Sequence, residues 1–332
     1  MVSINDIAKA LGISASTVSR ALKSHPDISL ETRELVKAYA AKVNYRPNAL
    51  ALSLKRQRSQ TIGLIIPEIV HHFFSSVISG IEELAYSKGY RLIICQSNED
   101  EARERINLQA LIDHRVDGIL VSVSKHTEKY DHFEEAIRDG IPIVLFDRAA
   151  DMLNTDKVLV DDYEGGLLAV NHLVSKGRKR IMHLAAPEAM SVGRQRRKGY
   201  LDGLKTHGID FERDLIITCD SRDGVLENQE SILKLAPEID GIFAVNDNTA
   251  ISVIQLLTAH GFKIPTDISV VGFGNDPIAS LVSPRLTTID QQGFTLGRQA
   301  VEVLIHRLER PSVAGSNQTR VIGVTLQVRE SS

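Results

Sequence analysis

The stretch "SINDIAKALGISASTVSRALKSH", residues 3–25, contains two short helical patterns of apolar residues with a tight break between them. Ser3 and Asp6 have the spacing of a capping box, which predicts where the first helix begins. Gly12 interrupts the period, and because glycine adopts a positive φ without steric cost, it predicts the turn. The pattern restarts after Ser14, which is expected to cap a second helix.

A third helix is expected to begin near Ser29. The side chains expected to face inward are Val18 and Leu22 of the second helix and Leu35, Val36, Tyr39 and Val43 of the third. The second helix is expected to present Ala15, Ser16, Ser19 and Arg20 outward. Three short helices in this order are typical of a helix-turn-helix unit, whose second helix lies in the DNA major groove. The pattern alone also fits another small helical domain.

The charge of the chain is unevenly distributed. Residues 1–60 contain ten Lys and Arg against four Asp and Glu, whereas the whole chain of 332 residues has a net charge of −3. A basic segment before an acidic remainder favours a polyanionic partner for the segment. A small solvated domain can also be basic without such a partner, so charge alone leaves both interpretations open.

After residue 60, short apolar runs rich in β-branched residues alternate with amphipathic stretches. The runs are 61–66, 91–95, 118–123, 142–146, 180–185, 241–245 and 268–273, and the stretches include 75–88, 101–114, 165–177 and 294–308. Repeated strand–helix units with continuous apolar strands predict parallel sheets covered on both faces. The units are too many for one sheet, and "VLVDDYEGG" at 158–166 indicates that a second subdomain begins there. We therefore expect two doubly wound subdomains with a ligand-binding cleft between them.

Signatures of catalysis, cofactors and export are not found in the sequence. It contains no Walker A, HExxH or GxSxG motif, and "GFGNDP" (272–277) has too few glycines for a dinucleotide fingerprint. We predict no enzyme activity, no cofactor and no metal, and interpret His71–His72 as a solvated loop. No apolar run reaches the roughly 20 residues of a membrane helix, and no secretory signal is visible. Cys95 and Cys219 are expected to be free thiols, which favours a reducing, cytoplasmic compartment.

Several motifs resemble those of the LacI/GalR family of bacterial transcription repressors. They are "INDIAKALGISASTVSRAL", "TRELVKAYAAKVNYRPNALALSL", "VDGILV", "HLVSKGRKRI", "GRQRRKGY", "GIFAVNDNTA", "DISVVGFGNDPIAS" and "PRLTTIDQ", and they occur in the order of the family. The resemblance covers nearly the whole chain. It implies paired heads that bind a palindromic operator and a core similar to periplasmic sugar-binding proteins.

The resemblance also implies a set of DNA-binding residues. Ala15, Ser16 and Arg20 match base-reading positions, and Thr17 and Ser19 match positions that contact phosphate. Arginine can pair bidentately with guanine O6 and N7, although a phosphate contact for Arg20 stays open. Residues 48–59 match the hinge helix, in which Asn48, Ala51 and Leu54 are expected to contact DNA. Leu54 matches the leucine that wedges into the minor groove; packing against the core is the alternative.

For the effector, the resemblance implies contacts in the core. The residues expected to bind it are Phe73, Phe74, Arg196, Asn246, Asp247 and Asn275. Alternatives are a surface salt bridge for Arg196 and core packing for the two phenylalanines. Two departures from the family pattern matter: Gly274 replaces a common aspartate, and Gly293 replaces an aromatic residue of some members. They favour a wider or less acidic pocket, and therefore larger or anionic sugars over simple galactosides.

The predicted fold is α/β: an all-α helix-turn-helix head (1–46), a hinge (47–60) and a core (61–332) similar to periplasmic binding proteins. The core is expected to comprise an N-subdomain, about 61–160 and 292–320, and a C-subdomain, about 161–291 and 321–330. We predict a transcriptional regulator, a repressor that binds operator DNA as a homodimer and is controlled by a small carbohydrate. A solute-binding protein would have no use for residues 1–60, and an enzyme would require a catalytic motif. The C-terminus lacks the extra heptad helix of tetrameric members, which favours a dimer.

Overall fold

The structure, a computed structural model, describes residues 2–45, 58–309 and 317–332. The chain divides into two compact units, Met1–Ser59, which includes the predicted head, and Gln60–Ser332, which includes the predicted core.

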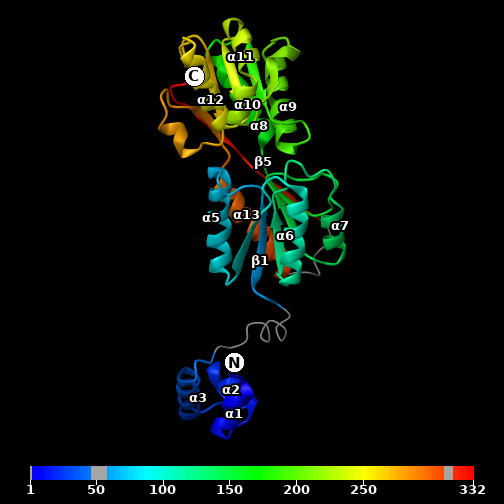
Figure 1. The fold of residues 1–332 in the computed structure, drawn as a ribbon, viewed down its shortest axis with the longest axis vertical. Coiled ribbons are helices and arrows are strands. Elements are labelled where there is room, and N and C mark those ends of the chain that lie inside the picture. The colour runs from blue at the N-terminus through cyan, green and yellow to red at the C-terminus, as the bar shows by residue number, and fades with distance from the viewer. Residues whose placement is uncertain (1, 46–57, 310–316) are drawn as a thin grey trace. The chain divides into compact units, whose positions relative to one another are not determined.

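Within its described residues the head contains three helices: α1 (Ile4–Leu11), α2 (Ala15–Leu22) and α3 (Leu30–Lys42) (Figure 1). The predicted capping box is confirmed, because the Ser3 hydroxyl accepts from the Asp6 N–H and the Asp6 carboxylate accepts from the Ser3 N–H at 2.9 Å. Gly12 ends α1 with a φ of 64°, as predicted for the turn. The Ser14 hydroxyl accepts from the N–H of Thr17 at 3.1 Å and so caps α2. These contacts fix a tight connection between two short helices.

Apolar side chains from all three helices form the core of the head. Ile7, Val18 and Val36 are fully buried there. The prediction that Leu35 faces inward was wrong, since 52% of it is exposed. Leu35 lies one residue, or about 100° around the helix, before Val36, and the i, i+3, i+4 face that starts at Val36 is the one that packs inward.

The first sheet of the core is six-stranded, with all pairs parallel and the order β11-β5-β4-β3-β1-β2. Its strands are β1 (Thr61–Ile66), β2 (Arg91–Gln96), β3 (Gly118–Val121), β4 (Ile143–Phe146), β5 (Asp156–Val160) and β11 (Thr319–Ile322). Helices α5 (His72–Ser87) and α13 (Gly293–Glu309) cover one face, and α6 (Glu101–Asp113) and α7 (Asp131–Arg138) cover the other (Figure 1). Burial of both faces explains why these strands are apolar throughout.

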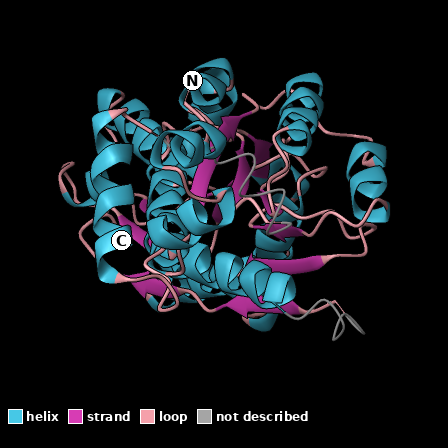
Figure 2. Cartoon of the chain, turned by 90° about the horizontal axis from the view of Figure 1, so that it is seen from below, coloured by secondary structure: helices cyan, strands magenta, loops and turns pink. Residues whose placement is uncertain are grey.

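The second sheet has the order β12-β10-β9-β8-β6-β7, and β12 is antiparallel to β10. Its strands are β6 (Ile181–Ala185), β7 (Ile216–Thr218), β8 (Gly241–Ala244), β9 (Ser269–Phe273), β10 (Thr287–Asp290) and β12 (Thr325–Gln327). The helices on its faces are α8 (Asp162–Ser175) and α9 (Ser191–Thr206) on one side, and α10 (Arg222–Glu227), α11 (Gln229–Leu235) and α12 (Asp247–Ala259) on the other. Figure 2 shows the magenta strands of the core between cyan helices.

The chain crosses between the two sheets three times, after β5, after β10 and after β11. The sequence-based boundary near residue 320 falls within β11, which continues to Ile322 in the first sheet. The subdomains built on the first and second sheets are called the N-subdomain and the C-subdomain below. Three crossing segments between two rigid sheets are the places where the subdomains can move relative to each other.

All seven apolar runs predicted to be strands form strands, with ends that differ by at most two residues. Five strands were missed: β5, β7, β10, β11 and β12. They are three to five residues long and carry Asp, Lys, Arg, Thr or Gln. Buried Thr287 and Thr288 of β10 show why the sequence pattern failed, because polar partners elsewhere in the fold satisfy their hydroxyls.

Both subdomains use glycine to bring two helices into backbone contact. A Cβ at Gly80 of α5 would overlap the carbonyl oxygen of Phe294, and one at Gly297 of α13 would overlap that of Val77. In the C-subdomain, Gly199 of α9 lies in the same way against the carbonyl of Tyr163 in α8. A side chain at these positions would force the helix pairs apart.

We predict that Gly297→Ala destabilises the core by about 1–3 kcal/mol, the range typical of overpacking. Thermal unfolding should report a melting temperature several degrees lower than that of the wild type. Gly323→Ala is the matched control, because a Cβ at Gly323 would meet no atom within 4 Å. Equal melting temperatures for the two variants would contradict the close approach of α5 and α13.

Candidate functional site

A cleft of about 880 Å³ lies between the two subdomains of the core. Its walls are made by residues that follow the carboxyl ends of strands in both sheets, such as Glu99 after β2, Asp147 after β4 and Gln291 after β10. Ligands of doubly wound proteins bind at this end of the strands. The volume lies within the range of small-molecule sites.

Arg196 reaches the cleft from α9 and is 6% exposed. Its Nε donates to Asp162 Oδ1 at 2.7 Å, and its Nη1 donates to the carbonyl of Val245 at 2.6 Å. The guanidinium carbon lies 3.7 Å from the ring centroid of Phe273. These contacts fix the orientation of the guanidinium. Arg196 does form a salt bridge, but the bridge is buried and not on the surface, as the alternative interpretation of the sequence had it. Burial raises the pKa of Asp162, while the Arg196 charge opposes that rise.

Asn246 and Asp247 lie in the cleft wall where α12 begins. The Asn246 side chain accepts from the Thr249 N–H at 2.8 Å and donates to the carbonyl of Asp220 at 2.7 Å. Asp247 accepts from the hydroxyl of Thr288 and, at 2.7 Å, from the N–H of Asp276. Both candidate residues therefore also hold the wall of the cleft in shape.

Three phenylalanines supply apolar surface to the cleft. Phe73 and Phe74 begin α5 on the N-subdomain side, with ring centroids 5.3 Å apart, and Phe273 ends β9 on the other side. Phe74 is 3% exposed and belongs to the core of the N-subdomain, whereas Phe73 is half-buried. Phe73 is the most exposed ring of the three, because Phe74 packs in the N-subdomain and Phe273, which is 1% exposed, lies against the Arg196 guanidinium.

Asn275 is not brought to the cleft. Its positive φ of 51° turns the backbone after Gly274, and its side chain binds Asp290 at 3.0 Å and Arg329 at 2.6 Å. The expectation that Asn275 contacts an effector is therefore not supported by its position. The residue instead ties the end of β9 to β10 and to the C-terminal segment.

Sequence reasoning missed several residues that line the cleft, among them Asp147, Arg148 and Lys125. Asp147 is 6% exposed, and burial raises the pKa of its carboxyl to about 7. Arg148 donates from Nη1 to both carboxylate oxygens of Glu99, at 2.7 and 2.8 Å. Their positions in the sequence could have identified them, because these polar residues follow predicted buried strands directly or within a few residues.

Acidic side chains outnumber basic ones around the cleft. The acidic residues are Glu68, Glu99, Asp147, Asp220, Asp223, Asp247 and Asp276, and the basic ones are Lys125, Arg148, Arg196 and Arg222, with His71 bound to Glu68. Burial raises the pKa of Asp247 to about 6 and that of Asp147 to about 7, so at neutral pH Asp247 is mostly ionised and Asp147 only partly. Carboxylates still outnumber cations around the cleft. Replacement of an aspartate by Gly274 does not make the cleft basic, and this charge balance disfavours the anionic sugars that the sequence ranked highly.

In the head, α2 presents the residues that match base-reading positions. Ser16 and Arg20 are exposed, whereas Ala15, Thr17 and Ser19 are half-buried. The hydroxyls of Ser16 and Thr17 lie 2.7 and 2.8 Å from that of Ser14. Ser16 and Arg20 are four residues apart and therefore share one face of the helix.

The three hinge residues of the prediction, Asn48, Ala51 and Leu54, lie outside the described residues. Both cysteines are free thiols as predicted, with Cys219 buried and Cys95 half-buried.

No helix within residues 2–45, 58–309 and 317–332 is long and apolar enough to cross a membrane.

Comparison with known families assigns both units of the chain. Residues 3–48 match the family described as bacterial regulatory proteins, lacI family. Residues 59–330 match the periplasmic binding proteins and sugar binding domain of LacI family. The chain belongs to the LacI family of transcriptional regulators. The resemblance, the overall fold class and the absence of an enzymatic role predicted from the sequence are thereby confirmed for this LacI-family regulator.

Relatives of the regulator resemble it over nearly its whole length. The ribose operon repressor of Escherichia coli strain K12 is 32% identical over 94% of this chain and 95% of its own. The transcriptional repressor PurR of Vibrio atlanticus is 32% identical over 93% of this chain and 92% of its own.

Solved structures of LacI-family proteins are similar to this chain over most or nearly all of its length. The lac repressor dimer bound to operator and the anti-inducer ONPF has a TM-score of 0.87 at 25% identity, and the match covers 99% of this chain and 98% of that one. A LacI transcriptional regulator from Alkaliphilus metalliredigens complexed with D-xylulofuranose has a TM-score of 0.72 at 33% identity, covering 82% of this chain and 99% of that one.

The buried carboxyl of Asp147 predicts a pH dependence of stability. Because its pKa is raised to about 7 in the folded chain from 3.8, the folded state binds the extra proton between these values, and stability falls as pH rises through that window. The Asp147→Asn variant lacks this titrating carboxyl, so its free energy of unfolding does not fall in the same way. The difference in unfolding free energy, variant minus wild type, should therefore increase by about 2–3 kcal/mol between pH 5 and pH 8.

Urea unfolding of both proteins at the two pH values measures the difference. Asp151→Asn, which removes a carboxylate that is 87% exposed from the same loop, is the control. An Asp147→Asn advantage that does not change with pH would contradict a buried, raised carboxyl.

Proposed function

We propose that this LacI-family regulator represses transcription as a dimer bound to a palindromic operator, and that a neutral sugar in the cleft controls its operator affinity. The observation that carries the proposal is one chain with both a helix-turn-helix head and a polar, partly aromatic cleft between two subdomains. We place the head at 1–46, the hinge at 47–60 and the core at 61–332. The protein would act in the cytoplasm, where its operator lies, and would require no cofactor.

We propose that α2 reads the operator in the major groove. Arg20 would pair with a guanine, and small Ala15 and Ser16 at the start of α2 would let the backbone approach the bases. Thr17 and Ser19 would contact phosphates. In the hinge, Asn48 and Ala51 would contact the minor groove and Leu54 would wedge into a base step, which requires a bent duplex.

The dimer follows from the geometry of recognition. One head covers a single half-site, and two heads related by a two-fold axis match an operator with the same symmetry. The lac repressor dimer bound to operator supports this arrangement.

For the effector, we propose a small neutral sugar, with pentoses as the first candidates. The excess of carboxylates disfavours an anionic ligand, whereas carboxylates and the Arg196 guanidinium can bind hydroxyl groups. The relatives named for a ribose operon and complexed with D-xylulofuranose support the pentose class. Phe73, Phe74, Arg196, Asn246 and Asp247 would form the contacts.

We predict that Arg20→Ala weakens binding to the selected operator by about 1–3 kcal/mol and relaxes base preference at one symmetric pair of positions. The operator would first be selected from randomised DNA with the wild-type protein, and affinities measured by fluorescence anisotropy on that site and its single-base variants. The wild-type affinity should fall steeply as salt rises, because phosphate contacts release counterions. Equal weakening of Arg20→Ala on every sequence would make Arg20 a phosphate contact instead.

Arg196 tests the effector site, but the single change Arg196→Ala would leave Asp162 buried without its partner, at a cost of about 3–5 kcal/mol. We therefore pair Arg196→Met with Asp162→Asn. This double variant should bind operator with nearly wild-type affinity and lose the response to sugar. Anisotropy titrations with and without a panel of pentoses and hexoses measure both properties. A double variant that responds to the same sugar at the same concentration as the wild type would exclude Arg196 from the effector site.

A further inference from the structure

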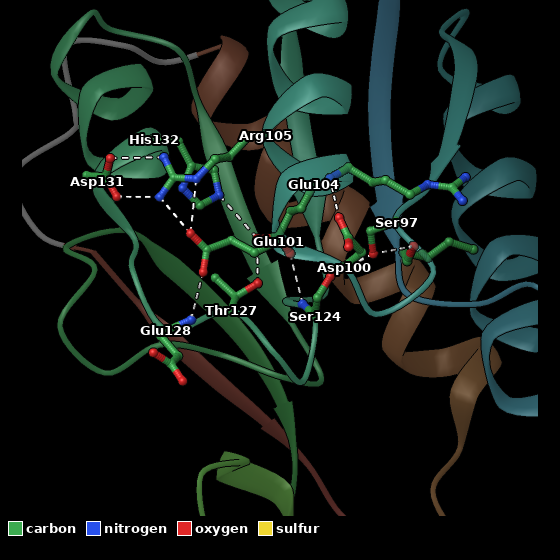
Figure 3. Close-up of polar contacts among 12 residues, drawn as sticks. Ser97, Asp100, Glu101, Glu104, Arg105, Ser124, Thr127, Glu128, Asp131 and His132 are labelled. Atoms are coloured by element: carbon green, nitrogen blue, oxygen red, sulfur yellow. Dashed lines mark hydrogen bonds and ion pairs between the residues drawn. The ribbon is translucent and has the colours of Figure 1, made fainter.

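The segment 122–130 joins β3 to α7 and is called the lip loop below (Figure 3). Its Lys125 lines the cleft and also a neighbouring cavity of about 540 Å³. Arg148, Met190 and Asp220 line both spaces as well, so the second cavity continues the cleft between the lip loop and the start of α9. Lys125 thus stands at the junction of the two.

Three carboxylates hold the backbone of the lip loop. Glu99 accepts from the N–H of Lys125 at 2.7 Å, and Glu104 accepts from the N–H of Ser124 at 2.8 Å. Glu101 accepts from the N–H of Glu128 at 3.1 Å. Glu101 and Glu104 lie on the first turns of α6, as Figure 3 shows. These three carboxylates add to the backbone hydrogen bonds that Ser122 makes to Ile65 of β1 and Val123 makes to Arg148, and together they set the position of the loop.

Glu104 is the central member of this network and is fully buried. Besides the Ser124 N–H, it accepts from the Thr127 hydroxyl at 2.8 Å, and Nε2 of His132 lies 3.1 Å from Oε1 (Figure 3). Nδ1 of His132 is buried without a partner among the described residues. Glu104 does not line either cavity, so it can act on the cleft only through the loop.

Lys125 differs from the cations beside it. The guanidiniums of Arg148 and Arg196 are paired with Glu99 and Asp162. The half-buried Lys125 side chain has neither hydrogen bond nor ion pair within the described part of the chain. An ammonium group carries three donors and no acceptor. Lys125 is therefore placed to donate to oxygen atoms of a ligand that extends from the cleft toward the second cavity.

We propose that Lys125 is a specificity-determining residue that donates hydrogen bonds to hydroxyl groups of the effector, and that Glu104 is the residue that positions it through the lip loop. This inference rests on the proposed function, a sugar bound in the cleft. The ligand chemistry is that of a neutral polyol whose hydroxyl-bearing end points toward the second cavity. Asp220 on the opposite wall can accept from the same hydroxyls, which disfavours a phosphate there.

The test uses the full chain and a panel of D-ribose, D-xylulose, D-galactose and cellobiose, titrated by calorimetry. For the sugar that binds the wild type most tightly, Lys125→Met should bind about tenfold more weakly, the effect of losing one charge-assisted hydrogen bond. Operator affinity and melting temperature should remain those of the wild type. Lys129→Met is the matched control, since this exposed lysine of the same loop lines neither cavity. Wild-type sugar affinity in Lys125→Met would overturn the role of Lys125.

Glu104→Gln separates a positioning role from a general structural one. Glu104→Gln should weaken sugar binding in the wild-type background. It should cause no further loss when Lys125→Met is already present, because Glu104 acts through Lys125. Equal losses of sugar affinity in both backgrounds would overturn the positioning role. Hydrogen exchange at the Ser124 and Lys125 amides should also be faster in Glu104→Gln without any sugar, and unchanged exchange would overturn it independently. If no sugar of the panel binds the wild type, the proposed function fails, and the role of Lys125 fails with it.

Discussion

The buried pair of Asp162 and Arg196 organises the C-subdomain half of the cleft. One guanidinium joins the start of α8, the middle of α9, the carbonyl that follows β8 and the ring that ends β9. A buried charge pair is retained only with good geometry and additional hydrogen bonds, and the 2.7 Å bond to Asp162, the bond to Val245 and the stacking on Phe273 provide them. The same guanidinium lines the cleft. The contact that holds this wall in shape therefore involves the same side chain that we propose binds the effector.

The two halves of the cleft are built differently. The C-subdomain wall is fixed by the ends of helices and strands, with Asn246 capping α12 and Asp247 joined to Thr288. On the N-subdomain side, the lip loop is held by the carboxylates of Glu99, Glu101 and Glu104. A ligand that contacts both halves favours the arrangement in which they are closest, and it can shift the conformation only by its differential affinity for the two arrangements. The three crossing segments are where such a shift would be accommodated.

The sequence predicts the architecture well where local pattern and burial agree. The seven strands with continuous β-branched runs, the caps at Ser3 and Ser14 and the start of α3 near Ser29 needed no tertiary information. Strand β10 could not be predicted, because burial of Thr287 and Thr288 depends on partners such as Asp247 and the N–H of Arg329, which are distant in sequence. In the cleft, the family resemblance pointed to Arg196 and Asn246. Asp147 and Lys125 were missed, although both come shortly after apolar runs that the pattern identified as strands. Asn275 was misplaced because a positive φ, which the sequence does not reveal, turns its side chain away.

The central claim is that occupancy of the cleft and binding of the operator are coupled. Linkage requires that a sugar which changes operator affinity by some factor bind the free and the operator-bound protein with affinities that differ by the same factor. The decisive measurement is a calorimetric titration of the sugar into the wild-type regulator, with and without saturating operator. We expect two dissociation constants whose ratio equals the sugar-induced change in operator affinity, on the order of 5–150-fold. Equal sugar affinity for the free and the operator-bound protein would contradict it.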